Sequence, residues 1–256
     1  MKFSIIGLGF ISTKHIEAIR FIGGEIVAGC DIEKKETEFP FFFDWKEMID
    51  KVETDYVVVC TPNDLHYKMC RYAESKGKKV ICEKPIALSS KGISKLKNTY
   101  AVLQLRYHPV LKEITQKENY GNLFVQVKRD KAYWDGWKGD TKRSGGLLMN
   151  IGIHYLDALL VLFGKKYNVE RAEETERIAQ GVLTFPRASI YYRMEIGDVS
   201  RRDLVVCGKT YSFSQKDNLA QENLHIRWYE ELARGRGIPA SEAVASLKLI
   251  EAIRKK

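Results

Sequence analysis

Apolar and polar positions follow two patterns along the chain, and the first pattern occupies the N-terminal part. Several short runs there are almost entirely apolar, as are strands buried on both faces of a parallel sheet. These runs are residues 1–6, 25–30, 54–60 and 79–82. Residues 14–21 and 64–75, which lie between them, have apolar side chains at helical spacing. Strands that alternate with helices predict an α/β fold with a doubly wound parallel sheet.

The pattern changes near residue 100. From there on, apolar and polar residues alternate in longer runs, which predicts an antiparallel or mixed sheet with one covered face. The predicted strands are residues 100–105, 122–128, 181–185, 189–194 and 204–213, the last forming a hairpin. Helices are predicted at residues 150–163, before Gly164, and at 241–254. We therefore expect two domains, residues 1–100 and 101–256.

A glycine turn follows the first apolar run and precedes the first helix. Gly7 allows a tight turn, and Gly9, followed by Phe10 and Ile11, lets the backbone approach a ligand. Free N–H groups at the helix start, together with the helix dipole, favour a pyrophosphate there. Ser12 replaces the third glycine, so the motif is imperfect. A phosphate-free turn in another α/β protein is the alternative.

The second apolar run ends at Asp31, about 20 residues after the turn, where a carboxylate binds the ribose 2′-hydroxyl of NAD. Ile32 follows, and no arginine stands beside Asp31 to accept a 2′-phosphate. These residues favour NAD over NADP.

The composition of the chain limits the classes of ligand and macromolecule that we expect the protein to bind. The 256 residues carry a net charge of +9, but no helix-turn-helix, zinc-finger or aromatic RNA-binding pattern is present. We expect no nucleic-acid partner and interpret part of the charge, notably residues 128–143, as attraction for an anionic small molecule. The five cysteines have no paired spacing, which suggests buried hydrophobes in a reducing compartment and no metal site. No apolar run approaches the roughly 20 residues of a membrane helix, and no leader precedes the first strand, so we expect a cytoplasmic protein without a membrane partner.

Two groups of residues are candidates for chemistry. Lys84, in Glu83-Lys84-Pro85, follows a predicted parallel strand, at the edge of the sheet where ligands gather. It could hydrogen-bond a substrate hydroxyl, although such a lysine is more often part of a surface turn. Asn150, His154 and Asp157 are spaced to share one helix face, which we expect to point into a cleft. An imidazole there can accept a proton, whereas the alternative is a core histidine.

These motifs together resemble the Gfo/Idh/MocA oxidoreductases over nearly the whole chain. The resemblance rests on the glycine turn at residues 7–12, Thr61-Pro62-Asn63 with His66, residues 83–85, and residues 152–157. It implies an NAD-binding Rossmann domain at residues 1–100. It also implies an α+β substrate domain with a large, mostly antiparallel sheet at residues 101–256, and a homo-oligomer, dimer or tetramer. Residues 31–45 and 85–100 are shorter than in most members, which could weaken the binding of the cofactor.

The segments at residues 103–109, 137–140 and 142–154 are similar to the nucleotide-sugar subgroup of this family. That similarity implies oxidation of the C3 hydroxyl of the UDP-sugar acid UDP-N-acetylglucosaminuronate in surface polysaccharide biosynthesis. It implies that Lys84 and His154 are the catalytic pair. Either His154 is the base and Lys84 positions the hydroxyl, or the two roles are exchanged. Asn150, in place of the aspartate of polyol-oxidising relatives, orients a substrate oxygen or the imidazole.

The resemblance also assigns binding residues. The expected cofactor contacts are Gly7, Gly9, Phe10, Ile11, Asp31, Thr61, Pro62, Asn63, His66, Glu83 and Lys84. The expected substrate contacts are Arg106, Lys138, Asn150 and Asp157. For Arg106 and Lys138, a surface charge or an intramolecular ion pair is an equal alternative. For the whole protein, the alternatives are an NAD(P)-dependent oxidoreductase acting on another sugar or polyol, and a non-catalytic ligand-sensing regulator.

Overall fold

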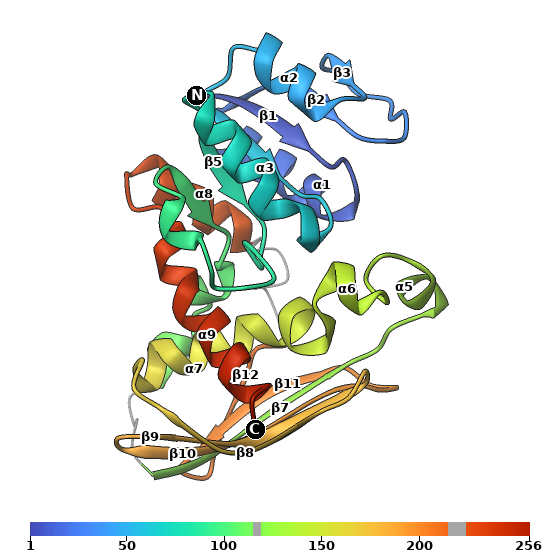
Figure 1. Ribbon diagram of the computed structural model, residues 1–256. Coiled ribbons are helices and arrows are strands. Elements are labelled where there is room, and N and C mark those ends of the chain that lie inside the picture. Colours follow the sequence, from blue (N-terminus) through green and yellow to red (C-terminus); the bar gives the residue numbers. More distant parts are fainter. Residues whose placement is uncertain (115–118, 215–223) are drawn as a thin grey trace. The chain divides into compact units, whose positions relative to one another are not determined.

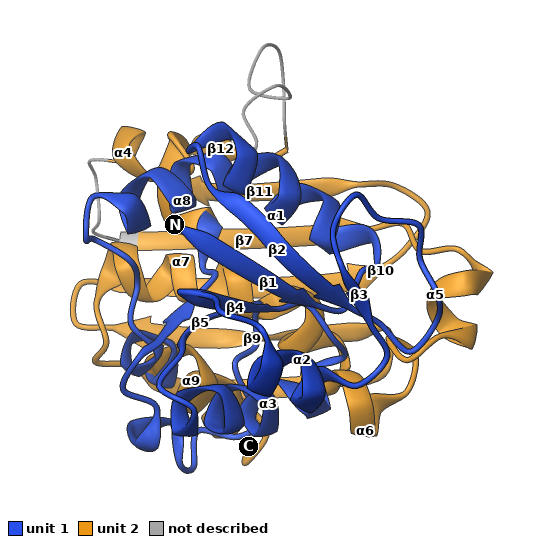
Figure 2. Ribbon diagram, turned by 90° about the horizontal axis from the view of Figure 1, so that it is seen from above, with its two compact units in different colours: residues 1–104, 221–244 blue, residues 105–220, 245–256 orange. Residues whose placement is uncertain are grey.

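The computed structural model describes residues 1–114, 119–214 and 224–256, and it divides into two compact units (Figure 2). The first unit consists of residues 1–104 and 221–244. The second consists of residues 105–220 and 245–256. A compact unit is not by itself an independently folding domain, so the domain boundary near residue 100 stays a prediction.

The first unit is built on a six-stranded parallel sheet in the order β3-β2-β1-β4-β5-β6. Its strands are β1 (Lys2–Ile6), β2 (Glu25–Cys30), β3 (Phe41–Phe42), β4 (Tyr56–Val59), β5 (Lys79–Cys82) and β6 (Thr99–Ala101). Its helices include α1 (Phe10–Phe21), α2 (Trp45–Lys51) and α3 (Asn63–Ser75). The prediction of a doubly wound parallel sheet is confirmed.

The strand order places the ends of β1 and β4 side by side. The chain leaves β1 toward β2 on one side, whereas β4 continues the sheet on the other side. Such a reversal opens a crevice at the carboxyl ends of the two strands, where ligands bind in sheets of this kind. All four residues of β4 are buried, which explains its continuous apolar run.

A late segment of the chain returns to the first unit. Helix α8 (Leu224–Ala233) packs against α1 and carries Trp228 and Tyr229, both 0% exposed. The indole Nε1–H of Trp228 donates to the carbonyl oxygen of Ala101, at 2.9 Å. Beyond α8, the backbone N–H of Ala101 donates to the carbonyl of Ile238. These contacts attach α8 and its following segment to the edge strand β6, which ends at Ala101 rather than continuing to residue 105 as predicted.

The second unit contains a six-stranded sheet in the order β12-β11-β7-β10-β9-β8. The strands are β7 (Asn119–Val127), β8 (Asn168–Glu174), β9 (Ile178–Phe185), β10 (Ala188–Ile196), β11 (Arg201–Val206) and β12 (Lys209–Ser212). Among the described strand pairs of this sheet, β10–β7 alone is parallel, so the sheet is mostly antiparallel as predicted. Buried and partly exposed residues alternate along β9 and β10, and α7 (Ile153–Phe163) and α9 (Val244–Ile253) lie on one face of the sheet (Figure 1).

Short helices connect these parts of the second unit. They are α4 (Val110–Glu113), α5 (Lys131–Asp135) and α6 (Thr141–Ser144). A π-helical turn, Leu148–Gly152, leads directly into α7, and Gly164 follows the end of α7 as predicted.

Among the described residues, one helical stretch, Thr141–Phe163, is long and apolar enough by composition to cross a membrane. Its most apolar window is 72% buried inside the structure, as is usual for a core helix. This corrects the expectation that no stretch approaches the required length. Asn150 and His154 are polar residues within this apolar stretch. The mean hydropathy of the most apolar window, 1.7, nevertheless stays high enough for a membrane-spanning helix.

We predict that Gly7→Ala destabilises the protein more than Gly77→Ala does. Both glycines have positive φ, at +89° and +75°, so alanine strains the backbone at each position by about 1–2 kcal/mol. At Gly7 alone, an added Cβ would also lie 2.8 Å from the carbonyl oxygen of Cys60, whereas Gly77 has open space. We expect losses in unfolding free energy of about 3 kcal/mol at Gly7 and about 1 kcal/mol at Gly77, measured by urea denaturation. Equal losses would contradict the close approach of the glycine turn to the end of β4.

Candidate functional site

The glycine turn lies between the ends of three strands in the first unit. Gly7 follows β1, and its backbone N–H donates to the carbonyl of Cys30 at the end of β2, at 2.8 Å. On the other side, Gly7 approaches Cys60 too closely for any side chain. A Cβ added at Gly9, in contrast, meets nothing within 4 Å. The backbone at Gly9 therefore faces open space, as a phosphate-binding turn requires.

Helix α1 begins immediately after this turn. No acidic residue lies in its first turn, so nothing there opposes an anion at the positive end of the dipole. Ser12 is 2% exposed, and its hydroxyl donates to the carbonyl of Gly9 at 2.6 Å. A small buried residue thus occupies the position of the third glycine. Phe10, expected to contact the cofactor, is 81% exposed.

Asp31 closes the site on the β2 side. One carboxylate oxygen accepts the backbone N–H of Leu8 at 2.7 Å, and the other accepts that of Glu33 at 3.1 Å. The carboxylate therefore lies against the glycine turn, as expected of a residue that binds the ribose. Ile32 is 90% exposed, so an apolar side chain and not a cation follows Asp31. These residues fit a dinucleotide with an unmodified ribose.

His66 links the two other motifs at this edge of the sheet. Its Nδ1 lies 2.7 Å from the carbonyl oxygen of Pro85, and its Nε2 lies 2.8 Å from that of Thr61. The ring is fully buried, and burial lowers the pKa of His66. His66 therefore holds together the segments that follow β4 and β5. Its role in binding the cofactor stays a prediction.

Lys84 is half-buried and follows β5 by two residues. Its backbone N–H donates to a carboxylate oxygen of Glu83 at 3.1 Å. The carboxyl end of β5 borders that of β4, which in turn borders that of β1. Within the first unit, Lys84 thus lies on the same sheet edge as the glycine turn.

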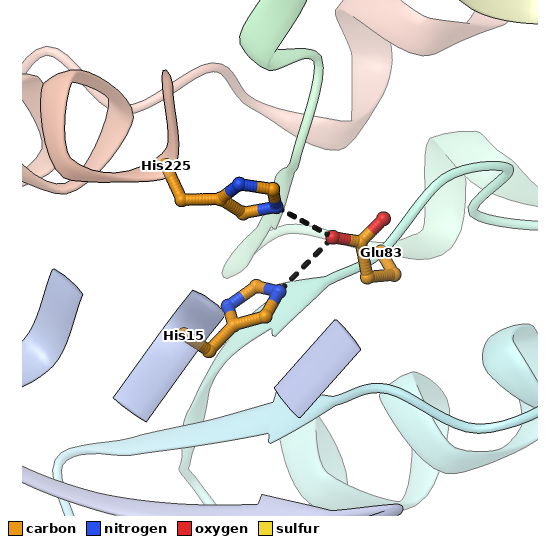
Figure 3. Close-up of side chains that lie close together, drawn as sticks. All are labelled: His15, Glu83 and His225. Carbon is orange, nitrogen blue, oxygen red and sulfur yellow. Dashed lines mark hydrogen bonds and ion pairs between the residues drawn. The ribbon is translucent and has the colours of Figure 1, made fainter. Parts of the chain in front are cut away.

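The carboxylate of Glu83 points toward both His15 and His225, as Figure 3 shows, and Glu83 is 5% exposed. Its Oε1 lies 3.0 Å from His15 Nε2 and 3.1 Å from His225 Nε2. From the sequence we expected Glu83 to contact the cofactor, and neither histidine was among the predicted site residues. One signal was available, since His15 stands one helical turn after the glycine turn on the buried side of α1.

In the second unit, His154 is the second residue of α7 and is half-buried. The π-helical turn that precedes it contains Asn150, whose Nδ2–H donates to the hydroxyl of Tyr133 at 3.0 Å. Single π turns occur frequently at functional sites. The convergence of Lys84 and His154 on one substrate oxygen stays a prediction.

Asp157 has an interior role. Its carboxylate accepts two hydrogen bonds from the Arg106 guanidinium, at 2.7 and 2.8 Å, and one from the Ser246 hydroxyl, at 2.6 Å. Asp157 is 2% exposed. This corrects the expectation that its carboxylate faces a cleft. The buried charge needs a bidentate cation, and Arg106 supplies it. Arg106 therefore forms an intramolecular ion pair, which was one of the alternatives that the sequence analysis gave for this residue.

A basic and aromatic group of residues surrounds Lys138. Burial, followed by repulsion from Arg129, lowers the pKa of Lys138. The Lys138 ammonium lies 5.8 Å from the ring centre of Trp137, and the Arg129 guanidinium lies 5.3 Å from that of Tyr133. Attraction to the Asp130 carboxylate opposes this lowering of the pKa, so Lys138 is influenced by both a cation and a carboxylate.

Comparisons with known proteins identify the family. A model of the oxidoreductase family with an NAD-binding Rossmann fold matches residues 1–109, and the model of its C-terminal α/β domain matches residues 110–183. The chain therefore belongs to the Gfo/Idh/MocA oxidoreductase family, and its N-terminal part is an NAD-binding Rossmann domain.

Among curated relatives, the chain is 31% identical to glucose-6-phosphate 3-dehydrogenase of Bacillus subtilis over 66% of this chain and 55% of the relative. It is 28% identical to D-glucoside 3-dehydrogenase of Escherichia coli, over 64% of this chain and 54% of the relative. The chain thus spans about half the length of the curated relatives it matches.

Solved structures of a WlbA (WbpB) dehydrogenase from Thermus thermophilus are also similar. One, in complex with NAD and α-ketoglutarate, has 29% identity and a TM-score of 0.85 over 96% of this chain and 92% of that chain. Another, in complex with NAD and UDP-GlcNAcA, has 28% identity and a TM-score of 0.85 over 100% of this chain and 95% of that chain.

We predict that Asp157→Asn destabilises the second unit, because it removes the negative charge that pairs with the Arg106 guanidinium in the interior. The expected loss in unfolding free energy is about 3 kcal/mol, the scale for breaking a buried ion pair. Glu38→Gln is the matched control, since the Arg20–Glu38 pair has side chains 57% and 83% exposed, and it should cost less than about 1 kcal/mol. Urea denaturation measures both losses. An Asp157→Asn protein as stable as the control would show that the pair is not structural.

We predict that Asp31→Asn narrows the preference for NAD over NADP. The amide keeps an acceptor for the Leu8 N–H but removes the charge that repels a 2′-phosphate. The ratio of the two dissociation constants, measured by calorimetry, should fall roughly tenfold, which corresponds to about 1.4 kcal/mol. An unchanged ratio would rule out Asp31 as the residue that selects the ribose.

Proposed function

We propose that the protein is an NAD-dependent dehydrogenase that oxidises the C3 hydroxyl of a UDP-sugar acid, UDP-N-acetylglucosaminuronate, for surface polysaccharide biosynthesis. One observation carries this proposal: the similarity of the chain, over its whole length, to the Thermus thermophilus dehydrogenase that was crystallised with NAD and UDP-GlcNAcA. The predicted homo-oligomer and the cytoplasmic location stay predictions.

Two further observations support the oxidation of C3 and the choice of an anionic sugar as the substrate. Both curated relatives named above are 3-dehydrogenases, which supports oxidation at C3 of a sugar ring. The net charge of +9 and the neighbouring cations Arg129 and Lys138 suit a substrate that carries a diphosphate and a carboxylate.

The residues suggest how the reaction proceeds. NAD, when bound, supplies an acceptor for the hydride that leaves C3 with both electrons of the C–H bond. We infer that His154 takes the hydroxyl proton as the C=O bond forms, and that the Lys84 ammonium donates a hydrogen bond to the same oxygen. Asn150 orients the substrate or the imidazole but transfers no proton, because an amide has no suitable acid–base equilibrium.

The alternatives are oxidation of another sugar or polyol and a non-catalytic ligand sensor. Glucose 6-phosphate shares an anionic group with the proposed substrate, so both belong in one substrate panel. A sensor would need neither a proton acceptor nor a hydrogen-bond donor at the reacting oxygen, and the presence of both Lys84 and His154 favours an enzyme.

We predict that the purified protein, mixed with UDP-N-acetylglucosaminuronate and NAD, forms NADH that is detectable by absorbance, bound or free. Glucose 6-phosphate and inositol, tested in parallel, should react at least about tenfold less efficiently. Lys84→Ala and His154→Ala should each lower turnover by about 100-fold or more. Lys68→Ala, which removes an exposed lysine of α3, serves as the control.

The results of these assays distinguish the proposed function from its alternatives. NADH formation only with glucose 6-phosphate or inositol would replace the substrate, and binding without NADH formation would favour the sensor. Normal turnover in either alanine variant would remove that residue from the mechanism.

A further inference from the structure

A buried cluster joins three elements of the first unit (Figure 3). Glu83 follows β5, His15 belongs to α1, and His225 belongs to α8. Both imidazoles direct Nε2 at the same oxygen of Glu83, at 3.0 and 3.1 Å. The three residues are 5%, 0% and 6% exposed, respectively. Water cannot solvate this carboxylate, so the protein itself must stabilise it.

The hydrogen bonds define where the protons lie. The Tyr229 hydroxyl lies 2.8 Å from His15 Nδ1 and can donate to it, which leaves the His15 proton on Nε2, facing Glu83. Burial lowers the pKa of His15, so its ring stays neutral. Burial opposes the ionisation of Glu83, but the hydrogen bonds from His15 and His225 hold its pKa well below the usual range. The cluster therefore contains an ionised carboxylate that accepts hydrogen bonds from two imidazoles.

The second carboxylate oxygen of Glu83 connects the cluster to Lys84, the candidate catalytic residue. It accepts the backbone N–H of Lys84 at 3.1 Å. His15 belongs to the helix that begins at the glycine turn, so one carboxylate binds both the phosphate-binding helix and the residue that carries the ammonium. All of these contacts are internal to the protein.

We propose that Glu83, His15 and His225 are positioning residues, which fix the backbone of Lys84 relative to the glycine turn and never contact the substrate. The proposal rests on the proposed function, in which Lys84 acts on the reacting oxygen. It changes the expected role of Glu83 from a cofactor contact to a residue that acts through Lys84. It also gives α8 a role, since that helix supplies one of the two imidazoles.

The same side chains, two histidines and one carboxylate, form a ligand set known for zinc and iron, and their ligand atoms lie within 4.8 Å of one another. Hydrogen bonds, however, explain the observed N···O distances, and Tyr229 already satisfies the second nitrogen of His15. We therefore favour the positioning role, and a bound metal is an outcome of the test that would overturn it.

The test compares His225→Leu with His225→Gln, because the glutamine amide can still donate to Glu83 whereas leucine cannot. Steady-state kinetics with UDP-N-acetylglucosaminuronate should show kcat reduced about 10- to 100-fold in His225→Leu, with KM for both substrates within about threefold of wild type. His225→Gln should retain kcat within about threefold. Glu83→Gln should behave like His225→Leu, and Glu53→Gln, whose parent side chain is 92% exposed, is the control for lost charge.

A second readout does not depend on activity. Hydrogen–deuterium exchange, followed by mass spectrometry on full-length proteins of matched thermal stability, should accelerate in the peptide that contains Lys84 in His225→Leu but not in His225→Gln. Unchanged exchange at Lys84, equal kcat in the two His225 variants, or one equivalent of zinc or iron in the purified protein would each overturn the proposal. If wild type oxidises no UDP-sugar acid, the proposed function fails, and the exchange result alone then decides the role of the cluster.

Discussion

The buried carboxylate of Glu83 is the constraint on which the first unit depends. An ionised group that is 5% exposed is stable only if the protein supplies donors, and they come from α1, from α8 and from the backbone of Lys84. Segments that are distant in the sequence must therefore meet at the end of β5 before the Glu83 carboxylate receives its hydrogen bonds. The same meeting brings the glycine turn and Lys84 to one edge of the sheet, so folding and the assembly of the site are coupled.

A second buried carboxylate organises the other unit in a similar way. Asp157 of α7 is stabilised by Arg106 and by Ser246 of α9, so one charge fixes the helix that also carries His154. In both units the candidate catalytic side chain lies within three residues of a satisfied interior charge. Rigid attachment of this kind holds a functional group in place.

The sequence predicted the local features well. Strands β2 and β5 begin and end at the predicted residues, and Gly7, Gly9 and Asp31 occupy one site, because strand, turn and helix signals all lie within about 30 residues of chain. Strand β8 was missed because it is an edge strand rich in charged residues, with only Val169 buried. The roles of Glu83 and Asp157 could not be predicted, since their partners lie 68, 142 and 51 residues away and local patterns do not report such contacts.

In the proposed mechanism, Lys84 and His154 act on one hydroxyl of a UDP-sugar acid beside NAD. A crystal structure of the protein with NAD and UDP-N-acetylglucosaminuronate tests it most directly. We predict density for the sugar with its C3 oxygen within hydrogen-bond distance of both side chains and with C3 facing the nicotinamide. Density for the sugar away from these side chains, or side chains that reach different parts of the ligand, would contradict the claim.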